Sequence, residues 1–434
     1  MREEQFIELP SQGSIYSVAR LGNTVLVGSG DHGKLYSYTA KGSLEEVSLT
    51  DLPNDIEIVA VDAFQDPYPV LAITFVQKPT SEVEDKPRTA GLHIYSTWTE
   101  PDSPSYTTVS SPESFQKGYS PNSNLKDVID SSLLELIGQQ SKTFRLDYIP
   151  YDLCHVPVKM DKDSYEHIFL LTGSDRKVHT FQADNINATF SEVSTDLFFP
   201  EMSKVFDSVV TRVQVESLNE TVRRISLCGC EDGTLHVWIV SSPQPFKNGT
   251  NGAQIKGGDG DTEVIEKIEH HFDGMITSIQ FYTDGFQFNV VVASACSPTY
   301  IYTNTIEDRF SKGVPLKFSS RWDTVEAVCV ADIDLDGRAE IIVGTFGCTM
   351  LVYKYMDDVM PQWVIVAHKK FSSGILSIDF VNFSLHVITS GGIHVIEYST
   401  SAYFHKYSSL LSGTIPEETA RASSESLTYK TENE

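Results

Sequence analysis

The 434-residue sequence has few basic residues: 33 Lys and Arg stand against 59 Asp and Glu, for a formal net charge of −26 at pH 7. Proteins that bind DNA or RNA need a cationic surface that displaces the counterions condensed on the phosphates. A surface with this net charge would also be repelled, on average, by an anionic membrane. The composition therefore argues against nucleic acid as a partner and leaves other proteins.

Long apolar runs and a secretory pattern are also missing. No stretch approaches the roughly 20 apolar residues that a membrane-spanning helix needs. The N-terminal segment MREEQFIELP has no apolar stretch of the kind found in signal peptides. The six cysteines are not spaced like a secreted disulfide framework. We therefore expect a cytoplasmic protein without membrane insertion.

Motifs of the common enzyme classes are absent as well, including the Gly-x-Ser-x-Gly elbow, the P-loop, kinase signatures and His-Glu-x-x-His. The segment GSGDHG at 28–33 satisfies Gly-x-Gly-x-x-Gly, but a dinucleotide site needs a helix next. The residues that follow, KLYSYT, alternate like a strand. We therefore predict no catalytic residues and no cofactor, apart from the calcium ion considered below.

The sequence does contain a repeat of short β-rich runs. Each copy has an apolar strand, then an apolar run ending in Gly or Ser, a tight turn, and an apolar–x–apolar–aromatic pattern. The second halves of the seven copies lie at 25–38, 70–96 (split by a polar insertion), 168–181, 225–238, 290–302, 340–353 and 386–398. One such sheet cannot bury both faces, whereas a closed ring of sheets can. We predict an all-β, seven-bladed β-propeller over 1–410, with residues 3–9 as an outer strand that closes the ring.

Three segments depart from the repeat. Residues 97–147 are predicted to be an insertion in the second or third blade, with a Pro/Ser-rich linker and an amphipathic helix. Residues 243–264 read as a flexible Gly-rich loop, and 411–434 as a disordered polar tail. The apolar face of the helix consists of Leu125, Val128, Ile129, Leu133, Leu136 and Ile137. This face either packs on its own blade or binds a protein partner.

An acidic loop precedes the sixth of these apolar runs. Asp332, Asp334 and Asp336 occupy positions 1, 3 and 5 of D-x-D-x-D-G, and Gly337 allows a tight bend. The twelfth position is not acidic, so the loop is not an EF-hand. Glu340 stands at the ninth position, where the FG-GAP loops of integrin α chains carry Asp. Carboxylates this close repel one another unless they are neutralised or well solvated. The four acids are a candidate calcium site, and the alternative is a hairpin corner without an ion.

Three long segments, 1–19, 133–182 and 331–355, resemble the kaptin family in the same order along the chain. That family is similar to the FG-GAP propellers, although the last blade here lacks a second D-x-D-x-D-G loop. The resemblance implies a non-catalytic scaffold or adaptor in a KICSTOR-like complex. Its partners would be a second FG-GAP propeller subunit, a large scaffold subunit and the GATOR GTPase-activating complex. The location implied is the lysosomal surface, where the complex restrains mTOR complex 1 when amino acids are scarce.

Two other functions stay open from the sequence. The resemblance also implies association with F-actin in lamellipodia or stereocilia, although the acidic composition makes direct contact with acidic filaments electrostatically unfavourable. The remote alternative is a propeller glycosidase or lyase that gathers carboxylates from several blades at its central funnel.

Overall fold

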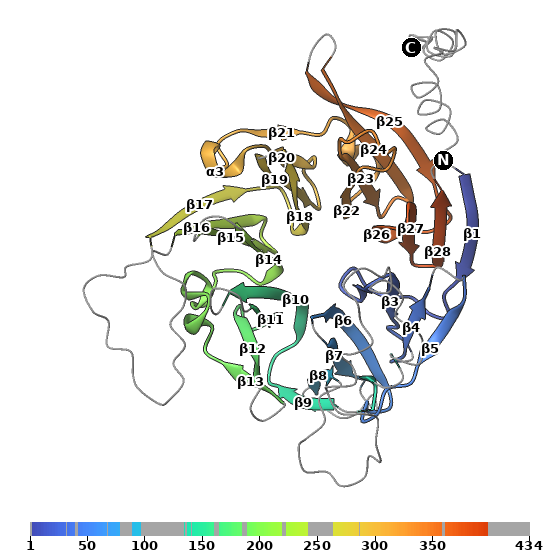
Figure 1. The fold of residues 1–434 in the computed structure, drawn as a ribbon, viewed down its shortest axis with the longest axis vertical. Coiled ribbons are helices and arrows are strands. Elements are labelled where there is room, and N and C mark those ends of the chain that lie inside the picture. Colours follow the sequence, from blue (N-terminus) through green and yellow to red (C-terminus); the bar gives the residue numbers. More distant parts are fainter. Residues whose placement is uncertain are drawn as a thin grey trace, which may run out of the picture.

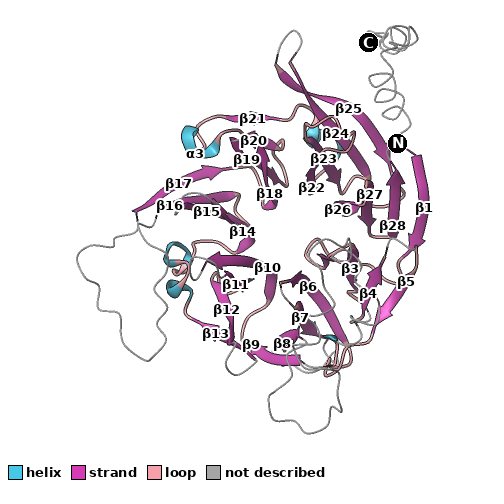
Figure 2. Ribbon diagram, in the orientation of Figure 1, coloured by secondary structure: helices cyan, strands magenta, loops and turns pink. Residues whose placement is uncertain are grey.

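The computed structural model describes residues 2–31, 33–39, 42–66, 68–78, 89–96, 134, 137–139, 141–159, 165–184, 189–218, 223–241, 264–285, 287–357 and 361–397. These residues form seven four-stranded antiparallel sheets. The sheets follow one another around a central axis with their first strands innermost (Figure 1), and most of the regular structure is strand (Figure 2). The predicted seven-bladed β-propeller is confirmed.

The strands of the first four sheets run in chain order from the inner to the outer edge. Sheet one contains β2 (Val18–Leu21), β3 (Thr24–Gly28), β4 (Leu35–Tyr38) and β5 (Leu44–Val47). Sheet two contains β6 (Ile56–Gln65), β7 (Pro69–Gln77), β8 (Ala90–Ser96) and β9 (Ser141–Leu146). Sheet three contains β10 (Pro150–Lys159), β11 (Tyr165–Gly173), β12 (Val178–Asp184) and β13 (Thr189–Val193). Sheet four contains β14 (Val210–Leu218), β15 (Arg223–Cys230), β16 (Thr234–Ser241) and β17 (Val264–His271).

The remaining sheets complete the ring. Sheet five contains β18 (Ile276–Asp284), β19 (Gln287–Ser294), β20 (Tyr300–Tyr302) and β21 (Gly313–Pro315), and sheet six contains β22 (Val325–Ala331), β23 (Glu340–Thr345), β24 (Thr349–Met356) and β25 (Gln362–Lys370). Sheet seven contains β26 (Ile375–Val381), β27 (Ser384–Thr389), β28 (Gly392–Glu397) and β1 (Arg2–Glu8). Short helices lie in the connections: η1 (Thr195–Leu197), η2 (Pro200–Met202), α3 (Thr305–Asp308) and η3 (Ser319–Trp322). None of the described helices is long and apolar enough to cross a membrane.

The ring is closed by the first strand of the chain. β1 pairs antiparallel with β28, so both ends of the propeller share one sheet, as predicted for residues 3–9. Glu3 accepts hydrogen bonds from His394 Nδ1 in β28 and from Lys369 Nζ in β25, both at 2.7 Å. The ring of Phe6 lies 4.6 Å from that of His394. These contacts join the N-terminal strand to both the sixth and seventh sheets.

The core is distributed between neighbouring sheets. Among the described residues, each of the seven junctions around the ring holds one apolar cluster that draws residues from both adjoining sheets. The middle strands are almost wholly buried; β3 and β23, for example, have no exposed residue. Because each sheet is covered on both faces by its neighbours, these strands read as continuous apolar runs. Burial of the middle strands at these junctions therefore explains why the repeat is recognisable in the sequence as a series of apolar runs.

The predicted boundaries of the insertions differ from those of the structure. Residues 141–146, assigned to the 97–147 insertion, form β9, the outer strand of sheet two. Phe144 and Leu146 of this strand pack into the junction between sheets two and three. The polar alternation of SKTFRL is typical of an outer strand with one exposed face, and its polar residues make the strand hard to distinguish from the preceding linker in the sequence. Val264, the last residue of the 243–264 loop, begins β17.

Candidate functional site

The acidic loop connects β22 and β23, the first two strands of sheet six. Asp332 organises its backbone: Oδ1 accepts the amide hydrogen of Asp336 at 3.0 Å, and Oδ2 accepts that of Gly337 at 2.8 Å. Leu335 and Gly337 have positive φ angles of 58° and 89°. The carboxylate of Asp332 therefore acts as the local cap of a tight turn.

The other three acids of the loop converge on the ammonium group of Lys354 in β24. Its Nζ lies 2.6 Å from Asp334 Oδ2, 2.7 Å from Asp336 Oδ2 and 2.8 Å from Glu340 Oε1. Burial lowers the pKa of Lys354, but the hydrogen bonds that its ammonium group donates to the three carboxylates outweigh this effect and raise the pKa above its usual range. Lys354 is therefore charged at physiological pH and neutralises part of the loop.

Glu340 is the most buried acid of this group, with 1% of its surface exposed. Its Oε2 accepts the amide hydrogen of Ile333 at 3.1 Å, and its Oε1 accepts from Lys354. Burial raises the pKa of Glu340, while the Lys354 ammonium opposes that rise. A carboxylate in this position needs a charged partner, because a buried unpaired charge is strongly unfavourable.

The predicted calcium ligands do come together: one carboxylate oxygen each from Asp332, Asp334 and Glu340 lies within 4.8 Å of the others. A calcium ion takes six to eight oxygen ligands. Of the eight carboxylate oxygens in the loop, however, seven already accept a hydrogen bond or ion pair: two each on Asp332, Asp336 and Glu340, and one on Asp334. With Lys354 in place, the residues do not fit a bound calcium ion.

Lys354 was missed in the sequence because it lies 14 residues beyond Glu340. A signal was nevertheless present. The β23–β24 pairing places Ile341 opposite Tyr353, so that Glu340 and Lys354 are the next residues along the same two strands. Lys354 also follows the buried Val352 and Tyr353, where a charged residue is unexpected without a partner. Cross-strand pairing of opposite charges is a common stabilising feature of antiparallel sheets.

The helix proposed for partner binding is described at only a few residues, and at these it packs on its own protein. Ile137 is fully buried and Leu134 is 2% exposed, both in the junction between sheets one and two. The carbonyl of Gly138 accepts two hydrogen bonds from Thr50, from its amide and its hydroxyl, each at 2.9 Å. Ile137 is therefore unavailable to a partner in this arrangement. The other residues of the predicted face lie outside the described residues: Leu125, Val128, Ile129, Leu133 and Leu136.

The inner strands carry charged groups that matter for the enzyme alternative. Asp152 in β10 is 5% exposed; its carboxylate accepts from Arg212 Nη1 at 3.0 Å and from the Val213 amide at 2.8 Å. Arg212 in β14 also donates to the carbonyls of Thr277 in sheet five and Ile15 ahead of sheet one. This arginine thus connects four parts of the ring around the axis. Asp152 is engaged in that structural bond network.

Glu326 in β22 differs from the other inner-strand acids. Burial and the nearby Asp323 carboxylate together raise its pKa to about 7, while Arg212 opposes the shift. Its Oε2 has no hydrogen-bond partner among the described residues. Asp379 in β26, another inner strand, also has a pKa raised by burial, which the Arg20 guanidinium opposes.

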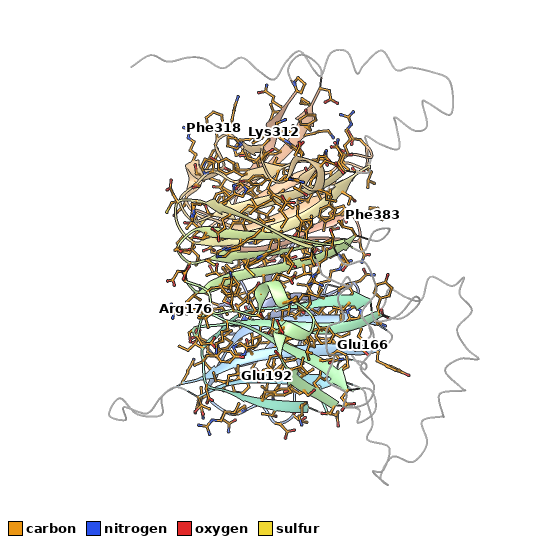
Figure 3. The ribbon with its side chains drawn as sticks, turned by 90° about the vertical axis from the view of Figure 1, so that its left-hand side faces the viewer. Glu166, Arg176, Glu192, Lys312, Phe318 and Phe383 are labelled. Atoms are coloured by element: carbon orange, nitrogen blue, oxygen red, sulfur yellow. The ribbon has the colours of Figure 1, made fainter. Side chains whose placement is uncertain are left out.

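Large apolar side chains are exposed on both faces of the ring. Phe318, 61% exposed, lies in the connection between β21 and β22, and Phe346, 55% exposed, lies in the β23–β24 turn. Phe383, 63% exposed, lies in the β26–β27 turn. Figure 3 shows Phe318 and Phe383 at opposite edges of the molecule when it is seen from the side. Exposed aromatic residues are favoured in protein interfaces. Both faces therefore offer groups suited to protein contacts.

The sequence profile of the family described as "KICSTOR complex protein kaptin" matches residues 1–121 and 109–407. The chain belongs to the kaptin family. The curated mouse protein of the same description is 25% identical to it over 436 residues, covering 92% of this chain and 88% of that protein. The kaptin resemblance noted in the sequence is confirmed.

Solved structures of other proteins align with this chain at low sequence identity. A structure entitled "Crystal structure of BBS1N in complex with ARL6DN, soaked with lead" aligns with a TM-score of 0.49 and 11% identity, covering 92% of this chain and 99% of that one. Raptor from Chaetomium thermophilum aligns with a TM-score of 0.49 and 12% identity, covering 92% of this chain and 29% of that one.

Proposed function

We propose that this kaptin-family chain is a non-catalytic scaffold or adaptor subunit of a KICSTOR-like complex. In this role it recruits the GATOR GTPase-activating complex to lysosomes and restrains mTOR complex 1 when amino acids are scarce. The observation that carries the proposal is the family match, which covers nearly the whole propeller. The mouse relative named as a KICSTOR complex protein matches over nine-tenths of this chain.

The physical character of the chain supports a scaffold. Seven mutually buried sheets with a closed seam make a rigid ring, and such a ring can hold several proteins on its faces and rim. The net charge of −26 favours partners with basic surfaces over nucleic acid or anionic lipid. Attachment to the lysosomal surface would then go through a protein partner.

Affinity purification from the native organism tests the proposal. The tag belongs on the C-terminal side, because the N-terminal strand is part of sheet seven. We expect the second FG-GAP propeller, the large scaffold subunit and GATOR subunits to co-purify, and the tagged chain to co-fractionate with lysosomes. Loss of the chain should leave mTOR complex 1 active during amino-acid starvation. Recovery of none of these proteins would contradict the proposal.

Two surface variants test which face of the propeller binds the protein partners. The double variant Phe318→Asp, Phe346→Asp alters one face, because the Phe346 amide donates to the carbonyl of Thr324 in the same connection that holds Phe318. Phe383→Asp alters the other face. Because all three side chains are more than half exposed, neither variant should reduce folding stability by much. The variant that loses partners while keeping a wild-type unfolding temperature marks the contact face. F-actin co-sedimentation of the same proteins tests direct filament binding.

A further inference from the structure

We infer that Lys354 is the resident cation of the acidic loop, so that the native hairpin is closed by an ammonium group and not by calcium. The same geometry implies that removal of this lysine turns the loop into a divalent-cation site. Neither statement depends on the proposed function.

The contacts of Lys354 are those expected of a central cation. Its Nζ lies within 2.8 Å of carboxylate oxygens on Asp334, Asp336 and Glu340, which come from three positions of the loop and its following strand. An ammonium group has three hydrogens to donate, and each has one acceptor here. The donors and acceptors match in number, so the pairing satisfies the whole ammonium group.

A calcium ion and this ammonium group exclude each other. Both would need the carboxylates of Asp334 and Glu340, and two cations that share carboxylates in a half-buried site repel strongly. The side chain of Lys354 is 16% exposed and that of Glu340 is 2% exposed. Displacement of the lysine would therefore leave the Glu340 carboxylate dependent on the incoming ion.

Without Lys354 the loop has the character of a calcium site. Four carboxylates would remain with no ammonium group among them, and oxygens from three of them already lie within 4.8 Å of one another. Asp334 Oδ1 is buried and has no hydrogen-bond partner among the described residues. Oxygen donors of this kind, held by one loop, are what calcium prefers.

The test uses the full chain, with CaCl₂ at about 1 mM, the range in which weak calcium loops bind, and the same concentration of MgCl₂ or EDTA. For the wild type we expect the same unfolding temperature in all three solutions and no heat of calcium binding by isothermal titration calorimetry. Lys354→Met should unfold at a lower temperature in EDTA and recover several degrees in calcium. Lys354→Arg, which keeps a cation, should not respond to calcium.

Two further variants control the experiment. Lys369→Met removes a lysine from the neighbouring strand β25 that pairs with Glu3 outside the acidic loop, and it should show no calcium response. Asp334→Asn in the wild-type background should lower the unfolding temperature equally with and without calcium. If calcium stabilises the wild type and Asp334→Asn abolishes that effect, calcium is the resident cation and the inference is wrong. If Lys354→Met folds and its unfolding temperature does not change with calcium, removal of the lysine does not create a cation site. If Lys354→Met does not fold, the calcium titrations of the wild type and of Asp334→Asn still decide which cation is resident.

Discussion

Sheets six and seven join their first two strands at the same position of the blade, but they close the turn by different physical means. In sheet six the connection from β22 to β23 is a long acidic loop held by Asp332 and Lys354. In sheet seven Val381 pairs directly with Ser384, so that Asn382 and Phe383 alone form the turn, with φ angles of 49° and 64°. Two consecutive residues with positive φ are typical of the tight turns that match strand twist.

The comparison shows where each turn draws its stability. The seventh turn depends on backbone geometry that L-residues other than glycine adopt at a cost. The sixth depends on side chains that neutralise one another, including Lys354 from a third strand. The first kind of turn should be insensitive to pH, whereas the second should respond to it. The predictions below use this difference, from the largest expected effect to the smallest.

Lys354→Met should have the largest effect. It removes the only cation that contacts Glu340 among the described residues, and Glu340 is 1% exposed. Removing one partner of a buried ion pair costs about 3–5 kcal/mol, and the partial exposure of Lys354 reduces the expected loss to about 2–4 kcal/mol. Urea denaturation in EDTA measures the change. A loss below about 0.5 kcal/mol, the range of ordinary surface substitutions, would mean that the carboxylates do not need the lysine.

The loss of folding stability caused by Lys354→Met should depend on pH. Burial raises the pKa of Glu340, so the folded state holds a proton on this group more readily than the unfolded state does. This carboxyl therefore contributes less to stability as the pH rises from its unfolded pKa of 4.5 through its folded value. Loss of the lysine raises the folded pKa further. The destabilisation should be smaller near pH 5 than near pH 8, and equal values at the two pH values would argue against an unpaired Glu340.

Gly337→Ala should destabilise the sixth turn by about 1 kcal/mol, because φ is 89° there and a side chain at positive φ is strained. An added Cβ would meet no heavy atom within 4 Å, so no clash contributes. Chemical denaturation at pH 5 and pH 8 should give the same loss at both. A pH-dependent loss would indicate that the substitution also displaces the carboxylates.

Phe383→Gly should stabilise the seventh turn slightly. Glycine relieves a positive φ that costs about 1–2 kcal/mol for other residues, and its greater freedom in the unfolded chain offsets about 0.5–1 kcal/mol of that gain. Phe383 is 63% exposed, so little packing is lost. The net gain of about 0.5 kcal/mol should be visible as a higher denaturant midpoint, the same at both pH values. A lower midpoint would show that Phe383 contributes packing to the fold.

Lys369→Met should have the smallest effect, a loss of about 0.5 kcal/mol. Its ammonium pairs with Glu3 at the ring seam, but both side chains are partly exposed and His394 also bonds to Glu3. Pairs of this kind contribute about 0–1 kcal/mol. The variant is the matched comparison for Lys354→Met, because it removes a lysine of the same sheet that has a single acidic partner. If Lys369→Met lowers the free energy of unfolding as much as Lys354→Met does, the contacts that hold β1 in the ring contribute as much to stability as the acidic cluster does.

The blades were predictable from the sequence because their physical cause is local. The middle strands are buried on both faces, so runs such as TVLVG in β3 and EIIVGT in β23 stand out as apolar segments that end at glycine or a small residue. The position of the acidic loop followed from the same repeat, and the closing role of β1 was predicted from its place ahead of the first copy. The outer strand β9 did not, because its exposed face resembles the linker that precedes it.

The amino-acid sequence alone determined the seven sheets and the acidic character of the sixth-blade loop, since each depends on the order of residues within one hairpin or one repeat. Only the tertiary structure decided what those acids contact. The pairing of β23 with β24 brings Lys354 to Asp334, Asp336 and Glu340. Likewise, the packing of two sheets determines that Ile137 is buried. In both cases the interacting residues are distant along the chain, and their contact exists only once the sheets have formed and packed.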